Sequence, residues 1–332
     1  MNIKRIRKRA NMRAILIGIL AALFFAVTFV FNHLMANEGG SWYFSSSLRF
    51  IFMLPFLWLI VVIKGKTGHV LKHISMYKSS WFIWSFFAFV LFYAPLTFAA
   101  EYSPGWVISG TWQITIICGM LLAPLFIDKV KVSGETILVR NKIPWRSLAI
   151  SSIMFVGIII IQIPQASEIH LNIFLLGFLP IIIAAFCYPL GNRKMMSVVK
   201  HDIGTIERVF GMTLVTMPVW FIIFGIGYIK HGLPSSNQVT QSFIVALFSG
   251  IIATVLFFYA TNLVKDDQEK LAGVEATQSL EVVFAIIGEM ILLGLPVPGP
   301  LSMLGVALII IGMAIYSFID SLPLKKPSKI NV

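Results

Sequence analysis

The sequence predicts an all-α membrane protein of ten transmembrane helices in two inverted five-helix repeats. The first supporting observation is composition: 58% of the 332 residues are hydrophobic and the mean hydropathy is +0.89, above the roughly 45–50% apolar share of soluble domains. The second is a series of apolar runs, each near the roughly 20 residues that a helix needs to cross the hydrocarbon core. The third is a shared order of motifs in the two halves of the chain.

The predicted spans are separated by short connections, so little of the chain remains for a catalytic domain outside the membrane. Their expected bounds are 14–35, 44–63, 81–99, 106–127, 146–163, 172–190, 207–229, 241–262, 272–293 and 300–319. The first run is longer than the apolar core of a secretory signal peptide, and we therefore expect a retained helix. After the fourth span, DKVKVSGETILVRNKIP alternates apolar and polar residues around SGE, which predicts a short hairpin.

The distribution of basic residues predicts the orientation of the helices. Lysine and arginine accumulate on the cytoplasmic side of membrane proteins. Here they gather before the first span, in the even-numbered connections and in the tail, whereas the opposite side has only Lys230. We therefore expect a multi-pass protein of the cell (inner) membrane with both termini in the cytoplasm, which requires an even number of crossings. The net charge of +12 follows from this asymmetry, and no nucleic-acid partner is expected.

An internal repeat is indicated by motifs that recur in the same order. RFIFM, which begins at Arg49 in the second span, matches RVFGM, which begins at Arg208 in the seventh, and VISGTWQITI in the fourth matches GVEATQSLEV in the ninth. Because each half has an odd number of helices, the second half must enter the membrane from the opposite side. Inverted repeats place the substrate site near the midplane between the halves; the alternative is a duplication kept only for folding. The predicted parts are a first repeat at 1–163, a second at 172–320 and a cytoplasmic tail at 321–332.

Ionisable residues inside the apolar runs are the strongest indication of a site, because a charge at the bilayer centre costs at least about 2.5–3.5 kcal/mol. Glu281 lies near the middle of the ninth span, and Glu275, Gln278 and Glu281 follow one polar side of that helix. Desolvation favours the neutral form of an unpaired carboxyl group, so Glu281 is expected to carry protons or to bind substrate. A structural salt bridge to Arg49 is the alternative. Glu275 is closer to the cytoplasmic surface, where water can solvate it.

Arg49 and several polar or aromatic residues complete the predicted substrate site. Arg49 either binds an anionic group or anchors its helix by extending to the lipid headgroups. Trp112 is suited to stack on a flat or cationic substrate. For the polar members, an interhelical hydrogen bond of about 0.6 kcal/mol is the structural alternative. The substrate-binding candidates are Glu281, Arg49, Glu275, Gln278, Trp112, Gln113, Asn32, Tyr188 and Tyr259.

Three other charged residues in the spans are not placed in this site. Glu101 and Glu289 lie near the outer ends of their helices, where we expect contact with water. Arg208 begins the seventh helix and is interpreted as one of the basic residues of the cytoplasmic side. None of the three is therefore a candidate ligand.

Several segments have a recognisable pattern: FFAVTFVFN in the first span, SLRFIFMLP in the second, WQITI in the fourth, FCYPLGNRK in the sixth, and GVEATQSLEVVFAIIGE and GVALIIIGM in the last two. Through them the chain resembles, over nearly its whole length, the drug/metabolite transporter superfamily and its multidrug resistance efflux transporter family. The resemblance implies ten helices in inverted halves and a small-molecule substrate. Related four-helix multidrug exporters use a glutamate in their first helix. The first span here has no acidic residue, so that role does not transfer by position.

These features predict a secondary active transporter, an antiporter that exports drug-like molecules or metabolites by alternating access with proton coupling through Glu281. The ATP-binding motif G-x-x-x-x-G-K-[ST] does not occur, so gradients or exchange must supply the energy. The alternative is an exchanger for a metabolite or lipid intermediate that holds an anionic group with Arg49. An enzyme is not expected, because acid–base and metal-binding residues are scattered. The expected partners are a small-molecule substrate and membrane lipid, without a cofactor; a homodimer is left open.

Overall fold

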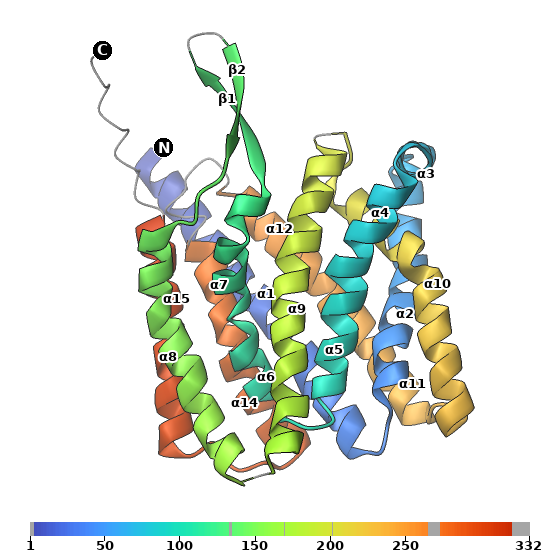
Figure 1. The fold of residues 1–332 in the computed structure, drawn as a ribbon, viewed down its shortest axis with the longest axis vertical. Coiled ribbons are helices and arrows are strands. Elements are labelled where there is room, and N and C mark those ends of the chain that lie inside the picture. Colours follow the sequence, from blue (N-terminus) through green and yellow to red (C-terminus); the bar gives the residue numbers. More distant parts are fainter. Residues whose placement is uncertain (1–2, 133–134, 169, 201, 265–272, 321–332) are drawn as a thin grey trace.

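The structure, a computed structural model, is a bundle of helices that stand side by side (Figure 1). The residues that it describes are 3–132, 135–168, 170–200, 202–264 and 273–320. A β-hairpin projects from the end of the bundle at which the first helix begins (Figure 1). The predicted tail at 321–332 lies outside the described residues.

The first half of the chain runs from α1 to α8. α4, η1 and α5 follow one another without a gap and form one rod, in which η1 is a π-helix. α6 and α7 form an interrupted rod, because a turn at Gln113 and Ile114 separates them. The bounds are α1 Ile3–Asn37, α2 Trp42–Ile63, α3 Thr67–Met76, α4 Lys78–Ser85, η1 Phe86–Val90, α5 Leu91–Ala99, α6 Gly105–Trp112, α7 Thr115–Leu121, η2 Ala123–Leu125, β1 Ile127–Val132, β2 Glu135–Arg140 and α8 Trp145–Glu168.

The second half of the chain runs from α9 to α15. α11, η3 and α12 form one rod with a π-helix, η3, at its centre. Residues 273–276 are helical and lead through a 3-10 turn, η4, directly into α14. The bounds are α9 Leu171–Val199, α10 Thr205–His231, α11 Ser236–Val245, η3 Ala246–Ala253, α12 Thr254–Asn262, η4 Thr277–Leu280, α14 Glu281–Leu292 and α15 Pro300–Asp320.

Many of these helices are long and apolar enough to cross a membrane. Within the described residues, seven helices meet both conditions: Met12–Asn37, Trp42–Ile63, Lys78–Ala99, Trp145–Ala166, Leu171–Val199, Thr205–His231 and Ser236–Asn262. Gly105–Leu121 and Pro300–Tyr316 are apolar but shorter, and η4 interrupts the segment 273–292. The predicted multi-pass helical protein is therefore confirmed, whereas the count of ten spans and the inverted repeat stay predictions.

The fourth predicted span, 106–127, is wrong in its continuity and in its end. The helix breaks after Trp112 and ends at Leu121. Beyond it the apolar run passes through η2, which contains Pro124, a residue that disfavours a helical conformation in the residue before it. Hydropathy records the lipid environment but not the backbone hydrogen bonds, so the break was not predicted.

The sixth predicted span, 172–190, ends too early. α9 continues to Val199, because Arg193 and Lys194 are polar but favour helical backbone. A fall in hydropathy marks the limit of the apolar layer rather than the end of the helix.

The predicted hairpin after the fourth span is confirmed. β1 pairs with β2 in antiparallel register, with Ile127 opposite Arg140 and Val132 opposite Glu135. The alternation of apolar and polar residues in this connection therefore did indicate strands.

The two π-helices lie inside long rods of the bundle. π-helical turns are uncommon and occur mostly as short bulges in α-helices, frequently at functional sites. In the first half, Pro95 has no N–H to donate to Leu91, the residue that follows η1. The hydrogen-bond ladder is therefore already weakened next to this bulge.

The core of the bundle is built from helix pairs that are distant in sequence. α15 packs along α8, α10 along α2, α9 along α5, and α1 along η3, α12 and α14. Between α2 and α10, the ring of Phe50 stacks on Trp220 at a centroid distance of 4.5 Å. Between α8 and α15 the backbones are in contact, since a Cβ atom on Gly157 would lie 2.7 Å from the carbonyl oxygen of Gly305. Small residues permit this close approach of membrane helices.

Candidate functional site

Glu281 is the first residue of α14 and follows directly on the 3-10 turn η4. Its side chain is buried, with 7% of the residue exposed. α14 packs against α1 and α6, so the carboxyl group faces the protein interior. In the part of the chain that the structure describes, the ion pairs are His33 with Glu289 and Lys64 with Glu207. The expected alternative, a salt bridge between Glu281 and Arg49, is not formed.

Arg49 on α2 is held by hydroxyl groups and an aromatic ring. Its Nη1 donates to Thr28 Oγ1 on α1 at 3.2 Å, and its Nη2 donates to Ser249 Oγ on η3 at 3.4 Å. The guanidinium carbon lies 4.1 Å from the ring centroid of Tyr93. The Nε atom is buried and has no hydrogen-bond partner among the described residues. Arg49 is only 8% exposed, so it does not extend to the lipid headgroups.

Tyr188 on α9 is more exposed than its place on the helix predicts. Helical spacing places it on the same face as Ile181, Ala184 and Met195, and all three of these are fully buried at 0% exposure. Tyr188 is nevertheless 37% exposed. A residue at the centre of the inward face can be this accessible only where neighbouring helices leave room.

Aromatic rings from three rods meet at Tyr188. The ring centroid of Tyr188 lies 4.8 Å from that of Phe92 on α5 and 5.5 Å from that of Trp112 on α6. Phe92 and Trp112 are 4.9 Å apart. Trp112 is the last residue of α6, so the interruption of the fourth rod places its indole beside Tyr188.

Three charged residues, Arg208, Glu281 and Arg49, also lie within electrostatic range of Tyr188. Three other predicted candidates and one residue that was not predicted therefore lie near Tyr188. We call this group the central cluster; its members are Arg49, Trp112, Tyr188, Arg208 and Glu281.

Arg208 was missed because an arginine at the start of a helix usually marks the cytoplasmic side. Its Nε atom is buried without a hydrogen-bond partner among the described residues. The neighbouring Glu207 is not its partner, since that carboxylate pairs with Lys64 on α2 at 3.3 Å. The match of RVFGM to RFIFM, which aligns Arg208 with Arg49, was the signal that could have identified it.

Three predicted polar candidates form structural hydrogen bonds. Asn32 Nδ2 donates to the hydroxyl oxygen of Tyr93 at 3.2 Å. Gln113 Nε2 donates to the carbonyl oxygen of Ser109 within its own rod. Gln278 Nε2 donates to the carbonyl oxygen of Gly18, which links η4 to α1. The bonds of Asn32 and Gln278 are interhelical, as in the structural alternative given for the polar residues, whereas that of Gln113 is not.

Two further candidates have exposed side chains. Glu275 is exposed, as its expected position near the surface implied. Tyr259 is 43% exposed, and the guanidinium of Arg13 lies 5.8 Å from its ring centroid.

Glu289 is the most deeply buried carboxylate among the described residues, at 1% exposure. It accepts hydrogen bonds from the backbone N–H groups of Gly105 at 2.6 Å and Trp106 at 3.3 Å, and pairs with His33 Nδ1 at 2.5 Å. The expectation that Glu289 contacts water is therefore wrong. The apolar residues MILL that follow it are the signal that it lies inside the apolar run.

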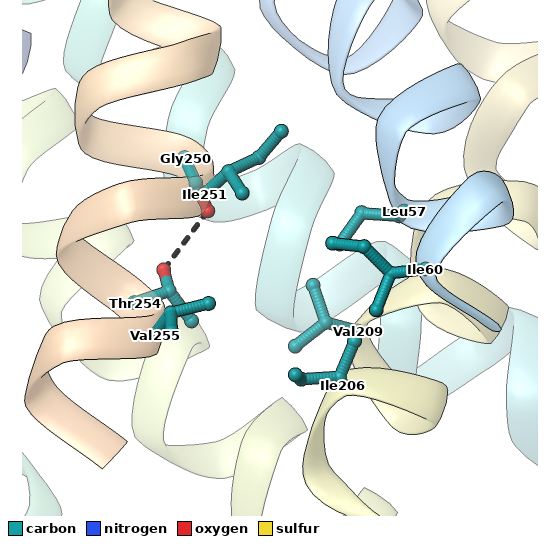
Figure 2. A pocket seen from close by; sticks show the side chains of 8 residues that line it. All are labelled: Leu57, Ile60, Ile206, Val209, Gly250, Ile251, Thr254 and Val255. Carbon is teal, nitrogen blue, oxygen red and sulfur yellow. Dashed lines mark hydrogen bonds between the residues drawn. The ribbon is translucent and has the colours of Figure 1, made fainter. Parts of the chain in front are cut away.

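A shallow apolar cleft separates the α2–α10 pair from η3 and α12 (Figure 2). In Figure 2 the side chains of Leu57 and Val209 extend into it from one side and that of Val255 from the other. The hydrogen bond drawn there, from Thr254 to the carbonyl oxygen of Gly250 at 2.9 Å, stays within one rod. The residues that line the cleft are Leu57, Ile60, Ile206, Val209, Gly250, Ile251, Thr254 and Val255.

The many apolar helices and the charged cluster buried among them define a multi-pass membrane protein. Residues 12–322 match the family described as "Putative multidrug resistance efflux transporter", and the chain belongs to this family. The predicted resemblance is therefore confirmed. Membership implies a membrane environment and a small-molecule substrate, and it fits a protein that is not an enzyme.

Two bacterial proteins are similar in sequence. The chain is 52% identical over 318 residues to "Uncharacterized protein YjlA" of Bacillus subtilis (strain 168), covering 96% of this chain and 98% of that one. It is 52% identical over 274 residues to "Uncharacterized 42.1 kDa protein in intracellular alkaline protease 3'region" of Shouchella clausii, covering 82% and 71% of the two chains. A solved structure named "Crystal structure of protein" has a TM-score of 0.61 at 13% identity, covering 92% of this chain and 97% of that one. At this identity the similarity concerns the fold alone.

Proposed function

We propose that the protein is a secondary active transporter that exports small molecules by alternating access, with proton coupling at Glu281. The observation that carries the proposal is the position of this carboxyl group. It is buried at a helix interruption, has no ion-pair partner among the described residues, and lies within electrostatic range of Tyr188, an inward-facing residue that is 37% exposed. A carboxyl group in lipid surroundings is expensive to keep charged, and such residues commonly mark proton or substrate pathways.

The order of interrupted rods supports ten helices in two inverted repeats. Counted along the chain, the third and eighth rods contain the π-helices η1 and η3. The fourth and ninth rods are broken, one at Gln113 and Ile114 and the other at η4. Each kind of interruption therefore occurs at the same position in both halves of the chain.

The packing of the helices supports the same proposal. α2 with α10 and α8 with α15 each join equivalent rods of the two halves. α1 packs on the rod of η3 and α12, and its counterpart α9 packs on the rod of η1 and α5. Duplicated, inverted halves of this kind work in transporters by rocking or gating against each other around a central site.

The rod of α11, η3 and α12 is joined to α2 more tightly at one end of the bundle than at the other. This difference supports a transporter that is open to one side of the membrane. At the end away from the hairpin, Gln238 Nε2 donates to Ser41 O at 2.7 Å and to Ser45 Oγ at 3.0 Å, and thereby joins α11 to α2. Toward the hairpin end, an apolar cleft lies between the same rods (Figure 2). By the distribution of basic residues, the hairpin end is cytoplasmic.

The decisive experiment is transport into proteoliposomes with an imposed pH gradient. Ethidium and indole-3-acetate serve as probe substrates for the wild type, for Glu281→Gln, and for the control Glu38→Gln, which alters an exposed carboxylate. We expect Glu281→Gln to lose gradient-driven accumulation and to keep counterflow exchange of unlabelled for labelled probe. Glu38→Gln should behave as the wild type.

Two results would contradict the proposal at different levels. Accumulation by Glu281→Gln at the wild-type rate would refute proton coupling through this residue. Failure of the wild type to move either probe faster than protein-free liposomes would refute the assignment as an exporter of such molecules.

A further inference from the structure

The imidazole ring of His33 stands between a buried carboxylate and the surface of the bundle. Its Nδ1 atom is 2.5 Å from Oε1 of Glu289 on α14, and Glu289 is 1% exposed. Its Nε2 atom is 3.3 Å from Nδ2 of Asn37, one turn further along α1, and Asn37 is exposed. Asn37 is the last residue of α1, at the end of the bundle away from the hairpin (Figure 1). The ring therefore turns one nitrogen toward the interior and the other toward water.

The hydrogen bonds of the ring indicate its protonation state. An amide nitrogen donates and does not accept, so Nε2 of His33 accepts from Asn37. A ring that accepts at Nε2 and donates at Nδ1 is neutral. Glu289 accepts from this Nδ1–H and from the backbone N–H groups of Gly105 and Trp106, and these three donors stabilise a carboxylate. In this arrangement the buried pair carries one net negative charge.

One added proton removes this charge and leaves every donor with an acceptor. The proton bonds to the lone pair of Nε2, and the resulting imidazolium forms an ion pair with the carboxylate of Glu289. The new Nε2–H then needs an acceptor. Half a turn of the Asn37 amide brings its Oδ1 to the place of its Nδ2, since the two ends of the amide have nearly the same shape. The same three side chains therefore satisfy both protonation states.

The neighbouring elements supply no competing group at the ring. In the part of the chain that the structure describes, the hydrogen-bond partners of the His33 ring are Glu289 and Asn37. Of the elements that pack on α1, the segments α6, α11, η3 and η4 contain no titratable side chain. The titratable or charged side chains on the other elements and on the connections at this end are Tyr43 and Arg49 on α2, Tyr259 on α12, Glu281 on α14, and Glu38, Glu101 and Tyr102 in the connections.

Several of these groups have partners of their own. Glu38 accepts from Gln241, Glu101 accepts from the backbone N–H of Trp42, and Tyr43 accepts from Lys230. Arg49 donates to Thr28 and Ser249. A proton that reaches this end of α1 from water therefore finds its free acceptor at Nε2 of His33.

We propose that His33 and Glu289 form a second proton-binding site, which takes up one proton at Nε2 of His33 from the side of the membrane away from the hairpin. This inference rests on the proposed function, because it adds a group that loads protons to the coupling proposed at Glu281. Glu281 and Glu289 are both buried on α14 and lie two turns apart, about 12 Å along the helix axis. An exporter driven by protons takes them from the outer side, which is the side of Asn37 by the distribution of basic residues.

Nitrogen NMR of the purified protein with isotope-labelled histidine tests the site without transport. The signals that His33→Gln removes identify His33. On lowering the pH from about 8 to about 5, the range in which histidine changes charge, we expect these signals to change from a neutral ring with Nδ1–H to an imidazolium. The signals of His170, an exposed histidine at the start of α9, serve as the reference. Asn37→Asp, which gives Nε2–H a carboxylate acceptor, should move the change at His33 to higher pH and leave His170 unaltered.

Two NMR results would overturn the proposal: a His33 ring whose charge stays the same over this range, or a neutral ring that carries its hydrogen on Nε2. If His33→Gln does not fold, the signals that Asn37→Asp shifts identify His33 instead.

Transport measures the use of the site. We expect His33→Gln to lose part of the accumulation of ethidium driven by the pH gradient and to keep counterflow, because the amide still donates to Glu289 but binds no proton. His170→Gln should behave as the wild type, and wild-type accumulation by His33→Gln would refute the loading role. An unchanging His33 ring in a protein that needs Glu281 for accumulation would leave the proposed function standing and refute only the second site.

Discussion

Replacement of Glu289 by alanine is expected to lower the free energy of unfolding by about 3–5 kcal/mol, the usual effect of removing one partner from a buried ion pair. The change leaves His33 without its partner and leaves the N–H groups of Gly105 and Trp106, at the start of α6, without an acceptor. The carboxylate also lies at the positive end of that helix dipole. Unfolding of the purified protein in mixed micelles with increasing dodecyl sulfate, followed by tryptophan fluorescence, measures the effect.

The control for Glu289 is Glu38→Ala, which removes an exposed carboxylate with one side-chain hydrogen bond from Gln241. Its effect should stay within about 0.5 kcal/mol, as for most surface substitutions. Glu289→Gln should fall between the two, because an amide oxygen can accept one of the backbone hydrogen bonds but cannot carry the charge. A Glu289→Ala protein as stable as Glu38→Ala would show that this buried group does not hold α6 against α14.

Gly157→Ala is expected to destabilise the protein by about 1–3 kcal/mol, the range for overpacking a tight contact. The added Cβ would lie 2.7 Å from the carbonyl oxygen of Gly305 and 3.0 Å from the backbone nitrogen of Ile309. Both are backbone atoms, so the contact is relieved only if α15 moves away from α8. The same unfolding experiment measures the loss.

Gly225→Ala in α10 is the matched control, because nothing lies within 4 Å of the Cβ that it adds. In a helix, alanine is favoured over glycine by about 1 kcal/mol, so this variant should be neutral or more stable than the wild type. Equal stability of the two alanine variants would indicate that α8 and α15 are not in backbone contact in the folded protein.

The positions of the long helices were predictable because the lipid environment selects residues by hydropathy alone. The predicted span 44–63 corresponds to α2, Trp42–Ile63, and the predicted span 207–229 corresponds to α10, Thr205–His231. The interruptions were not predictable in this way. Gln113 and the turn at η4 depend on local backbone hydrogen bonding, to which hydropathy does not respond.

The candidate site was predicted in part, because sequence gives the depth of a residue along a helix but not its partners. Glu281 and Arg49 were identified from charge within apolar runs, and both are buried. Glu289 was expected to contact water. Its partners, His33 and the start of α6, come from distant parts of the chain, so the sequence did not reveal them. Tyr259 was chosen by its residue type; it is 43% exposed, and its place in the site stays a prediction.

The π-helix η1 changes how the sequence around it should be read. A turn closed by bonds between residues five apart takes in one residue more than an α-helical turn, and one residue corresponds to about 100° around a helix of 3.6 residues per turn. The apolar periodicity of Lys78–Ser85 is therefore out of phase with that of Leu91–Ala99. A cysteine-accessibility scan along this rod would report a slip at Phe86–Val90, and alignments with relatives that lack the bulge would need a gap of one residue there.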